Sequence, residues 1–213
     1  MNFKELWKTL INGVLAGLFI GIAGTVYLAC PYPVLGAFLF GLGLLTIVCN
    51  QFKLFTGAVG YLADQGRKAP GYLVTLVFIW SGNLIGCFLC GSAVRMTRSA
   101  ELLGIVRKAE VICGVKCADS WDSLLILAFF CGILMYLAVD TFKREDVTPV
   151  VRMTNLFLCV AVFILCGFEH CIANMYYFSA AGMWSLQNLL LILLMTLGNA
   201  LGGMLIPAAN KVR

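Results

Sequence analysis

The segment CGFEHCIANM, residues 166–175, places a carboxylate and an imidazole next to each other inside an apolar stretch. Glu169 and His170 lie within the run from Asn155 to Met183, and His170 is the single histidine of the chain. An imidazole can donate a hydrogen bond, accept one or carry a proton. An adjacent acid and base suggest enzyme chemistry, whereas a lone polar residue in an apolar run suggests a residue that lines a cavity.

The apolar surroundings of these side chains suggest different roles for them. A charge at the centre of a bilayer costs on the order of 3 kcal/mol or more. Glu169 must therefore be paired, hydrogen-bonded or protonated, and we expect it to support the structure, with Asn174 and free backbone amides as partners. We expect a functional role for His170, because polar groups in membrane spans tend to line cavities. The case for a functional role of Thr56 is weaker when this residue is taken alone, because the hydroxyl of a threonine in an apolar helix usually hydrogen-bonds to its own backbone.

The composition indicates which elements must position these residues. Of 213 residues, 62% are hydrophobic and 12% are charged, whereas about a quarter of a soluble domain is charged. We therefore expect an all-α integral membrane protein with one transmembrane domain over residues 1–213. A span needs roughly 20 apolar residues, so this length accommodates about six helices. The predicted spans cover residues 9–29, 34–52, 72–94, 122–140, 154–180 and 184–206.

Two segments could be read in other ways. The first apolar run follows a basic start, as in a signal peptide, but it is too long for a signal core and carries glycines at helical spacing. We expect it to be a retained first span. The longest polar stretch, from Arg95 to Asp122, is expected to contain a short amphipathic helix at about Ala100 to Ala109.

The second and fifth predicted spans are interrupted by polar residues, at NQFKLFTG and at CGFEHC. The interruptions fall at comparable places in the two halves, as in an inverted repeat of three plus three spans with one discontinuous helix in each half. Irregular backbone at membrane depth must be satisfied by protein or by a water-filled cavity. Two facing breaks therefore predict a pore or a substrate site. Its half-helix N-termini would favour a small anion, and Thr56 and His170 would add polar groups.

The basic residues indicate the orientation. With both termini inside, the inner segments hold nine Lys and Arg residues and the outer segments five, and the positive-inside rule favours this arrangement. Lys53 belongs to neither group. The basic residues do not cluster with aromatic residues as in a nucleic-acid-binding face, and we expect no cofactor and no metal site.

The ten cysteines lie mostly within apolar runs, where a free thiol packs as a small hydrophobe. We interpret Cys87 and Cys90, in IGCFLCGS, in this way. Cys113 and Cys117 lie outside the clear spans and could form a disulfide in an oxidising compartment, without further support in the sequence.

The two interruptions also carry a resemblance. GFEHCIANM is similar to the signature of the formate/nitrite transporter family of pentameric anion channels, KLFTG resembles that family's second-span break, and NGVLAGLFIGIAG fits its first span. The similarity runs over nearly the whole chain. It implies an aquaporin-like protomer, a homopentamer in which each protomer has its own pore, and a central site made by Thr56 and His170.

The resemblance implies roles for further residues. Lys116 matches a family lysine at the vestibule mouth, with a solvated loop lysine as the alternative. Gly132 stands where many members carry asparagine, which puts in doubt a polar contact near His170. The family's pore has two apolar constrictions around the central site. By spacing from the two motifs, the matching positions are Phe40, Leu44, Leu54, Phe55 and Phe163.

These expectations define a multi-pass protein of the inner (plasma) membrane with cytoplasmic termini, a channel or transporter and not an enzyme. Its expected ligands are small monovalent weak-acid anions, which Thr56, His170 and Lys116 would bind. Formate is the first candidate, followed by nitrite and hydrosulfide, with lactate or acetate if the constriction is wide. A bare anion would lose its solvation at two apolar rings, so we expect passage as the neutral acid. The proton would come from bulk water or from His170.

Two other classes remain as alternatives. An aquaporin-like channel for neutral solutes would share the two half-helices, but the chain lacks an Asn-Pro-Ala motif. An intramembrane thiol oxidoreductase would use Cys87 and Cys90 or Cys113 and Cys117.

Overall fold

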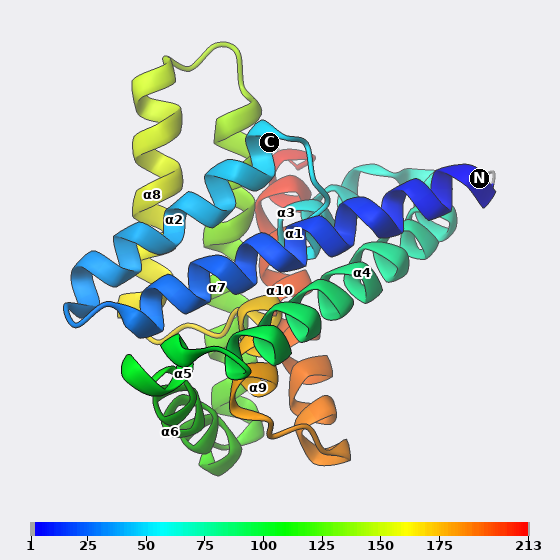
Figure 1. Ribbon diagram of the computed structural model, residues 1–213. Helices are drawn as coiled ribbons and strands as arrows, with labels where there is room; N and C mark the ends of the chain where they lie inside the picture. Colours follow the sequence, from blue (N-terminus) through cyan, green and yellow to red (C-terminus); the bar gives the residue numbers. More distant parts are fainter. Residues whose placement is uncertain (1–2, 213) are drawn as a thin grey trace.

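The computed structural model describes residues 3–212, and in this range the regular elements are all helices (Figure 1), which confirms the all-α prediction. The α-helices are α1 (Phe3–Ala29), α2 (Pro33–Cys49), α3 (Phe55–Ala58), α4 (Ala69–Arg95), α5 (Arg98–Leu102), α6 (Ile105–Ala118), α7 (Trp121–Lys143), α8 (Pro149–Leu165), α9 (Cys171–Ala181) and α10 (Leu186–Asn210). Two 3₁₀ helices, η1 (Val59–Asp64) and η2 (Gly66–Lys68), connect α3 to α4.

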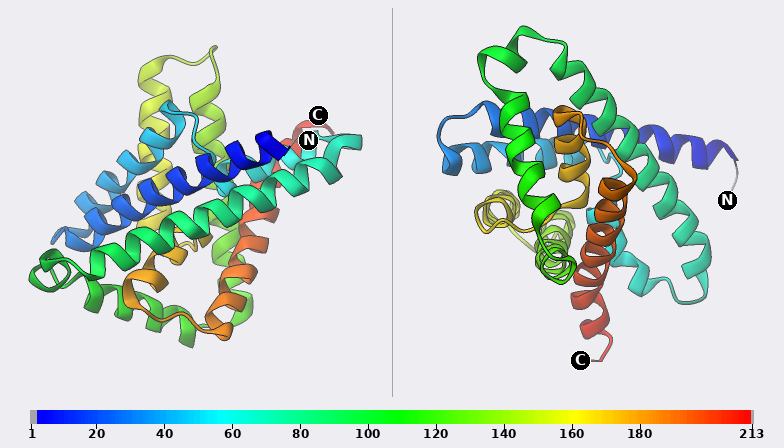
Figure 2. Two further views of the ribbon diagram at one scale, coloured as in Figure 1. Left: turned by 45° about the vertical axis from the view of Figure 1, so that its right-hand side comes forward. Right: turned by 90° about the horizontal axis from the view of Figure 1, so that it is seen from below.

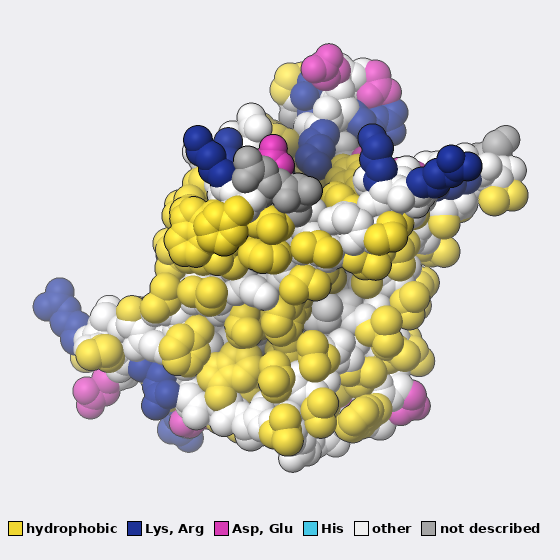
Figure 3. All heavy atoms as spheres, turned by 90° about the vertical axis from the view of Figure 1, so that its right-hand side faces the viewer, with side chains coloured by type: hydrophobic (Ala, Val, Ile, Leu, Met, Phe, Trp, Pro, Cys, Tyr) yellow, Lys and Arg dark blue, Asp and Glu magenta, His cyan; other side chains and the backbone are white. Residues whose placement is uncertain are grey.

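Among residues 3–212, four helical segments are long and apolar enough to cross a membrane: α1, α7, α10 and the segment Gly66–Arg95, which includes α4. The second predicted span corresponds to α2, and the fifth, at 154–180, is divided between α8 and α9. Helices α2 and α8 are shorter apolar helices of 17 residues each. Figure 3 shows a broad apolar surface on one face of the molecule, with charged side chains gathered mainly above and below it. This distribution matches a membrane protein whose charged ends face water.

The short helices α2 and α8 begin and end in the same way. Each has a proline in its first turn, where the missing N–H is not needed. Each ends with a residue of positive φ, Gln51 at 57° and Gly167 at 68°. The next N–H then reaches back five residues, from Phe52 to Ile47 O and from Phe168 to Phe163 O. This Schellman-type ending satisfies the last carbonyls and turns the chain inward.

Closely packed helix pairs hold the two breaks in place. Helix α1 packs along α4, and α7 packs along α10 (Figure 2). Small residues make this possible: a Cβ on Gly17 would lie 2.3 Å from Asn83 O, and one on Gly132 would lie 2.2 Å from Asn199 O. Such glycines let helix backbones approach closely.

The segment between α4 and α7 is more helical than the sequence suggested. The expected amphipathic helix at 100–109 is two helices, α5 and α6, separated by Gly104 with φ of 62°. Helix α6 continues to Ala118, so Lys116, for which a solvated loop position was the alternative, lies on a helix that packs against α9. The prediction ended this helix too early because packing against α9 stabilises it, and such a contact is not visible in the local sequence.

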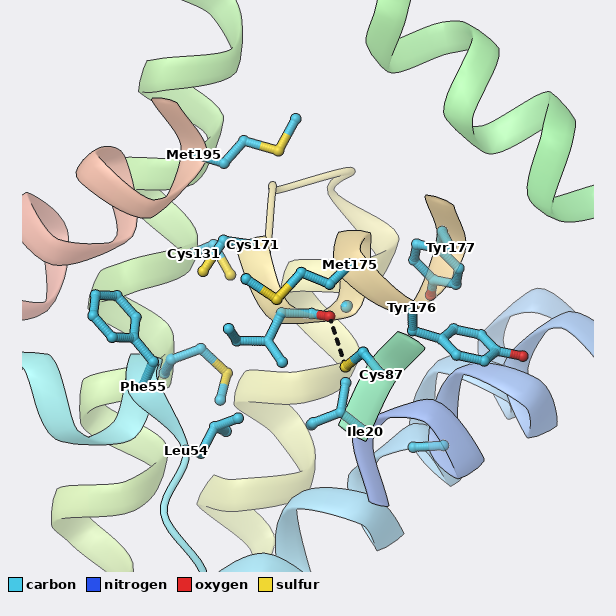
Figure 4. Close-up of a cluster of buried hydrophobic side chains, with 14 of the residues drawn as sticks. Ile20, Leu54, Phe55, Cys87, Cys131, Cys171, Met175, Tyr176, Tyr177 and Met195 are labelled. Carbon is cyan, nitrogen blue, oxygen red and sulfur yellow. Dashed lines mark hydrogen bonds between the residues drawn. The ribbon is translucent and has the colours of Figure 1, made fainter. Parts of the chain in front are cut away.

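A cluster of apolar side chains fills the space between the breaks (Figure 4). It includes Leu54 and Phe55 from the first break, and Cys131, Cys171 and Met195 near the second. The breaks are therefore embedded in a packed core.

Candidate functional site

Thr56 and His170 meet in the interior of the molecule. Thr56, in α3, is completely buried, and His170, directly before α9, is 2% exposed. The Thr56 Oγ1 atom lies 3.0 Å from His170 Nε2. The structure thus joins the two polar side chains that the interruptions pointed to, although they are 114 positions apart.

The second nitrogen of His170 defines the direction of this hydrogen bond. His170 is the N-cap of α9, and its Nδ1 accepts the N–H of Ala173 at 3.0 Å. A nitrogen that accepts carries no proton, so in the neutral imidazole the proton is on Nε2. His170 therefore donates to Thr56, and the hydroxyl proton of Thr56 is available to a ligand.

One asparagine stabilises the first break. Asn83, buried in α4, accepts the N–H of Phe55 at 2.9 Å. Its amide nitrogen donates to the carbonyls of Lys53 and Gly13, each at 2.8 Å. These bonds satisfy backbone groups that no helix satisfies at this point.

A second asparagine stabilises the second break with the same pattern. Asn199, buried in α10, accepts the N–H of Cys171 at 2.9 Å. It donates to the carbonyls of Glu169 at 2.8 Å and Ala128 at 2.7 Å. In both halves the accepted N–H lies 28 residues from the asparagine and the break carbonyl lies 30 residues from it.

Glu169 is held by an ion pair and an amide. Lys116 Nζ lies 2.6 Å from Glu169 Oε2 and 2.8 Å from Oε1. Asn174 Nδ2 donates to the same carboxylate at 2.6 Å and also contacts Met195 Sδ at 2.9 Å. The expected partner Asn174 is therefore in place, and Lys116 is a partner that the sequence did not indicate. Since Lys116 is paired, its charge is largely compensated.

A cavity of about 230 Å³ extends from this ion pair to His170, and Thr56 is not among the residues of its wall. Lys116, Glu169 and Asn174 lie on its wall, together with His170 and Phe163. The ring of Phe163 stacks on His170 with centroids 5.4 Å apart. An apolar ring therefore borders the imidazole on this side.

The other expected constriction residues are buried near the two breaks. Phe40 packs edge-on against Phe163, with ring centroids 5.9 Å apart. Leu44 lies one turn further along α2, and Leu54 and Phe55 directly precede Thr56. All five expected constriction residues belong to one buried apolar cluster.

Gly132 does not face the site. Its absent side chain would point at the backbone of Asn199, so no side chain fits there without separating α7 from α10. The position therefore serves helix packing, and it gives no evidence of a lost polar contact to His170.

The ten cysteines are free thiols. Cys113 and Cys117 do not form a disulfide, and Cys117 Sγ lies 3.3 Å from Asn188 Oδ1. Burial raises the pKa of the Cys113 thiol to about 12. Cys87 donates to the carbonyls of Gly17 and Ile172, each at 3.3 Å, and Figure 4 marks one of these bonds. These contacts fit packing, not thiol redox chemistry, which needs accessible thiolates.

The sequence analysis missed the two asparagines that stabilise the breaks. A signal for them was present, because GNLIG at 82–86 and GNALG at 198–202 repeat one pattern in the two halves. A buried asparagine in a membrane span is costly unless it is hydrogen-bonded. Two such residues in repeated motifs would have pointed to equivalent positions.

Apolar spanning helices and two breaks that meet at a buried polar pair define a helical membrane protein with an internal site. A family model described as formate/nitrite transporter matches residues 2–211. The chain belongs to this family, and it is accordingly a membrane transport protein rather than an enzyme.

Curated relatives and solved structures agree with this assignment. A probable formate transporter of Methanothermobacter thermautotrophicus is 26% identical, over 95% of this chain and 87% of the relative. The formate channel FocA of Escherichia coli is 27% identical, over 81% of this chain and 66% of the relative. A solved structure described as a pentameric formate channel with formate bound superposes with a TM-score of 0.82 at 26% identity, covering 100% of this chain and 98% of the other.

Proposed function

We propose that the chain is a channel for small monovalent weak-acid anions, formate first and then nitrite or hydrosulfide, in which Thr56 and His170 form the central binding site. The observation that carries this proposal is the 3.0 Å contact between these two side chains where the breaks meet. The free hydroxyl proton of Thr56, oriented by the bond from His170 and with Phe163 beside the imidazole, suits a small ligand that carries acceptor oxygens or sulfur.

We further propose six membrane spans in an inverted repeat of three plus three, with α2 continuing through α3 and η1 and with α8 continuing through α9. The matching endings of α2 and α8 and the matching asparagine bonds support the repeat. The pentameric state of the solved structure supports a homopentamer in the inner membrane. Cytoplasmic termini follow from the distribution of basic residues.

The hydrogen bonds of His170 favour one source for the proton that makes the passing acid neutral. His170 can give up its Nε2 proton only after Nδ1 has taken one, because imidazolate is inaccessible. Protonation of Nδ1 would break the bond to Ala173 N–H and place a cation at the positive end of α9. We therefore propose that the proton comes from water as the local dielectric falls, and that His170 and Thr56 hold the passing ligand.

Flux measurements in proteoliposomes test this function. A panel of formate, nitrite, hydrosulfide, acetate and lactate is measured at an acidic and a neutral external pH. Formate flux should be faster at acidic pH, since more of it is neutral. His170→Asn keeps an N-cap acceptor for Ala173 but removes the Nε2 donor, and it should slow flux while preserving the fold. Flux that is indifferent to pH and to this substitution would contradict the mechanism.

Two additional readouts distinguish the alternative functions. High water permeability in stopped-flow light scattering, without anion flux, would indicate a neutral solute channel. Activity that disappears in Cys87→Ala or Cys113→Ala, in the absence of flux, would indicate a thiol oxidoreductase.

A further inference from the structure

Lys53 occupies the position in the first break that Glu169 occupies in the second. Asn83 donates to the carbonyl of Lys53, and Asn199 donates to the carbonyl of Glu169, in each case 30 residues away. The two side chains therefore leave the backbone at equivalent points of the two breaks. They carry opposite charges.

The two charges are compensated differently. Glu169 is 5% exposed and is paired with Lys116 and Asn174. The Lys53 side chain is exposed, and within residues 3–212 its ammonium group has no ion pair or hydrogen bond. Its backbone is nevertheless fixed, because its N–H donates to Asn12 O at 3.2 Å and its carbonyl is bound by Asn83. Lys53 is thus a free charge on a rigid support.

The charged groups around Lys53 leave the end of the molecule at which it lies with an excess of positive charge. Lys143, at the end of α7, is close enough for the two ammonium groups to repel each other, and Asp140 compensates Lys143 in part. Lys211 and Asp64 compensate each other, with Nζ and Oδ1 3.7 Å apart. The uncompensated charge of Lys53 directly precedes the expected constriction residue Leu54. Figure 1 shows this connection running from the end of α2 into the interior at α3.

We propose that Lys53 recruits anions at the inner mouth of the pore, and that the pore takes up small monovalent anions more readily from this side than from the side of Lys116. The physical reason is that Lys53 offers an uncompensated charge, whereas Lys116 is neutralised by Glu169. A fixed cation at a mouth raises the local anion concentration and the association rate. The inference rests on the proposed function, since it requires a small-anion pore with cytoplasmic termini.

Uptake of radiolabelled formate into membrane vesicles of both orientations tests the inference. In the unmodified protein, half-saturation should occur at a lower formate concentration for entry from the inner face than from the outer face. Lys53→Gln should raise the half-saturating formate concentration for entry from the inner face about two- to five-fold, as expected for one charge at short range in water. It should leave the half-saturating concentration for entry from the outer face unchanged. Lys53→Arg should keep the original asymmetry.

A matched control removes the same charge elsewhere at the same end. Lys68 is exposed in η2, away from both breaks, and Lys68→Gln should change the half-saturating formate concentration in neither direction. Equal effects of Lys53→Gln on both directions, or no effect, would overturn the role of Lys53. Absence of formate flux in either direction in the unmodified protein would overturn the proposed function instead.

The salt dependence of the unmodified protein provides a measurement without mutation. Screening shortens the range of the Lys53 charge as ionic strength rises. The inner half-saturating concentration should therefore increase with salt more steeply than the outer one. Equal salt dependence in the two directions would contradict the inference even if the glutamine variant failed to fold.

Discussion

At the scale of single residues, the polar side chains of the interior divide into the Thr56–His170 pair, for which we propose ligand binding, and those that hydrogen-bond the backbone of the breaks. Thr56 and His170 are hydrogen-bonded to each other where the two breaks meet. Asn83 and Asn199 each bind one N–H and two carbonyls of the backbone. The second group satisfies the irregular backbone around the Thr56–His170 contact.

Replacement of these asparagines should destabilise the protein. Asn83→Ala leaves the N–H of Phe55 without its partner, and Asn199→Ala does the same to Cys171. A buried unsatisfied donor costs about 1–3 kcal/mol, so each variant should lower the midpoint of thermal unfolding in detergent. Asn155→Ala is the control, because Asn155 donates one longer bond, 3.2 Å, to Leu137 O. A drop as large in this control would contradict the special role of the asparagines.

At the scale of elements, glycines determine how closely the spanning helices pack. Gly17 and Gly132 lie against the backbone at Asn83 and Asn199, so the helix contacts and the asparagine bonds occur at the same places. A shift of α1 from α4, or of α7 from α10, would therefore also disturb a break.

Alanine at Gly132 should destabilise the helix pair. The new Cβ would lie 2.2 Å from Asn199 O, which is backbone and cannot rotate away. Overpacking of this kind costs about 1–3 kcal/mol, measurable as a lower unfolding midpoint. Gly114→Ala in α6 is the matched control, since a Cβ there meets nothing within 4 Å. It should be neutral or stabilising by up to about 1 kcal/mol, because alanine favours helix. Equal losses in both variants would refute the packing argument.

At the scale of the whole molecule, the apolar surface and the charged ends define how the protein sits in a bilayer. The face in Figure 3 carries a broad apolar region with charged side chains above and below it. The basic residues predict the orientation of these ends, which is open to direct measurement.

Single-cysteine labelling should show the orientation. On a background with all ten native cysteines replaced by serine or alanine, Glu145→Cys lies between α7 and α8, and Arg98→Cys lies in α5 at the opposite end. In intact cells a membrane-impermeant maleimide should label Arg98→Cys and not Glu145→Cys. In inverted vesicles the pattern should be reversed. The opposite result would place the termini outside and would exchange the two mouths of the pore.

Much of the class and of the site could be predicted from the sequence, for a physical reason. Hydrocarbon makes every polar residue in a span expensive, so Thr56 and His170 stand out in apolar runs. The all-α architecture and the membership in the formate/nitrite transporter family were predicted from composition and from the two motifs, and both are confirmed. The constriction residues and the substrate remain predictions.

Which charged side chains pair with one another could be seen only in the tertiary structure. Local sequence could not show that Lys116 pairs with Glu169 and that Lys53 stays free, because the partners lie on different helices. The same holds for Asn83 and Asn199, whose bonds reach across helix packing contacts. The sequence by itself determined where polar groups enter the membrane. Which of them neutralise each other, and which remain available to a ligand, was decided only when packing brought distant residues together.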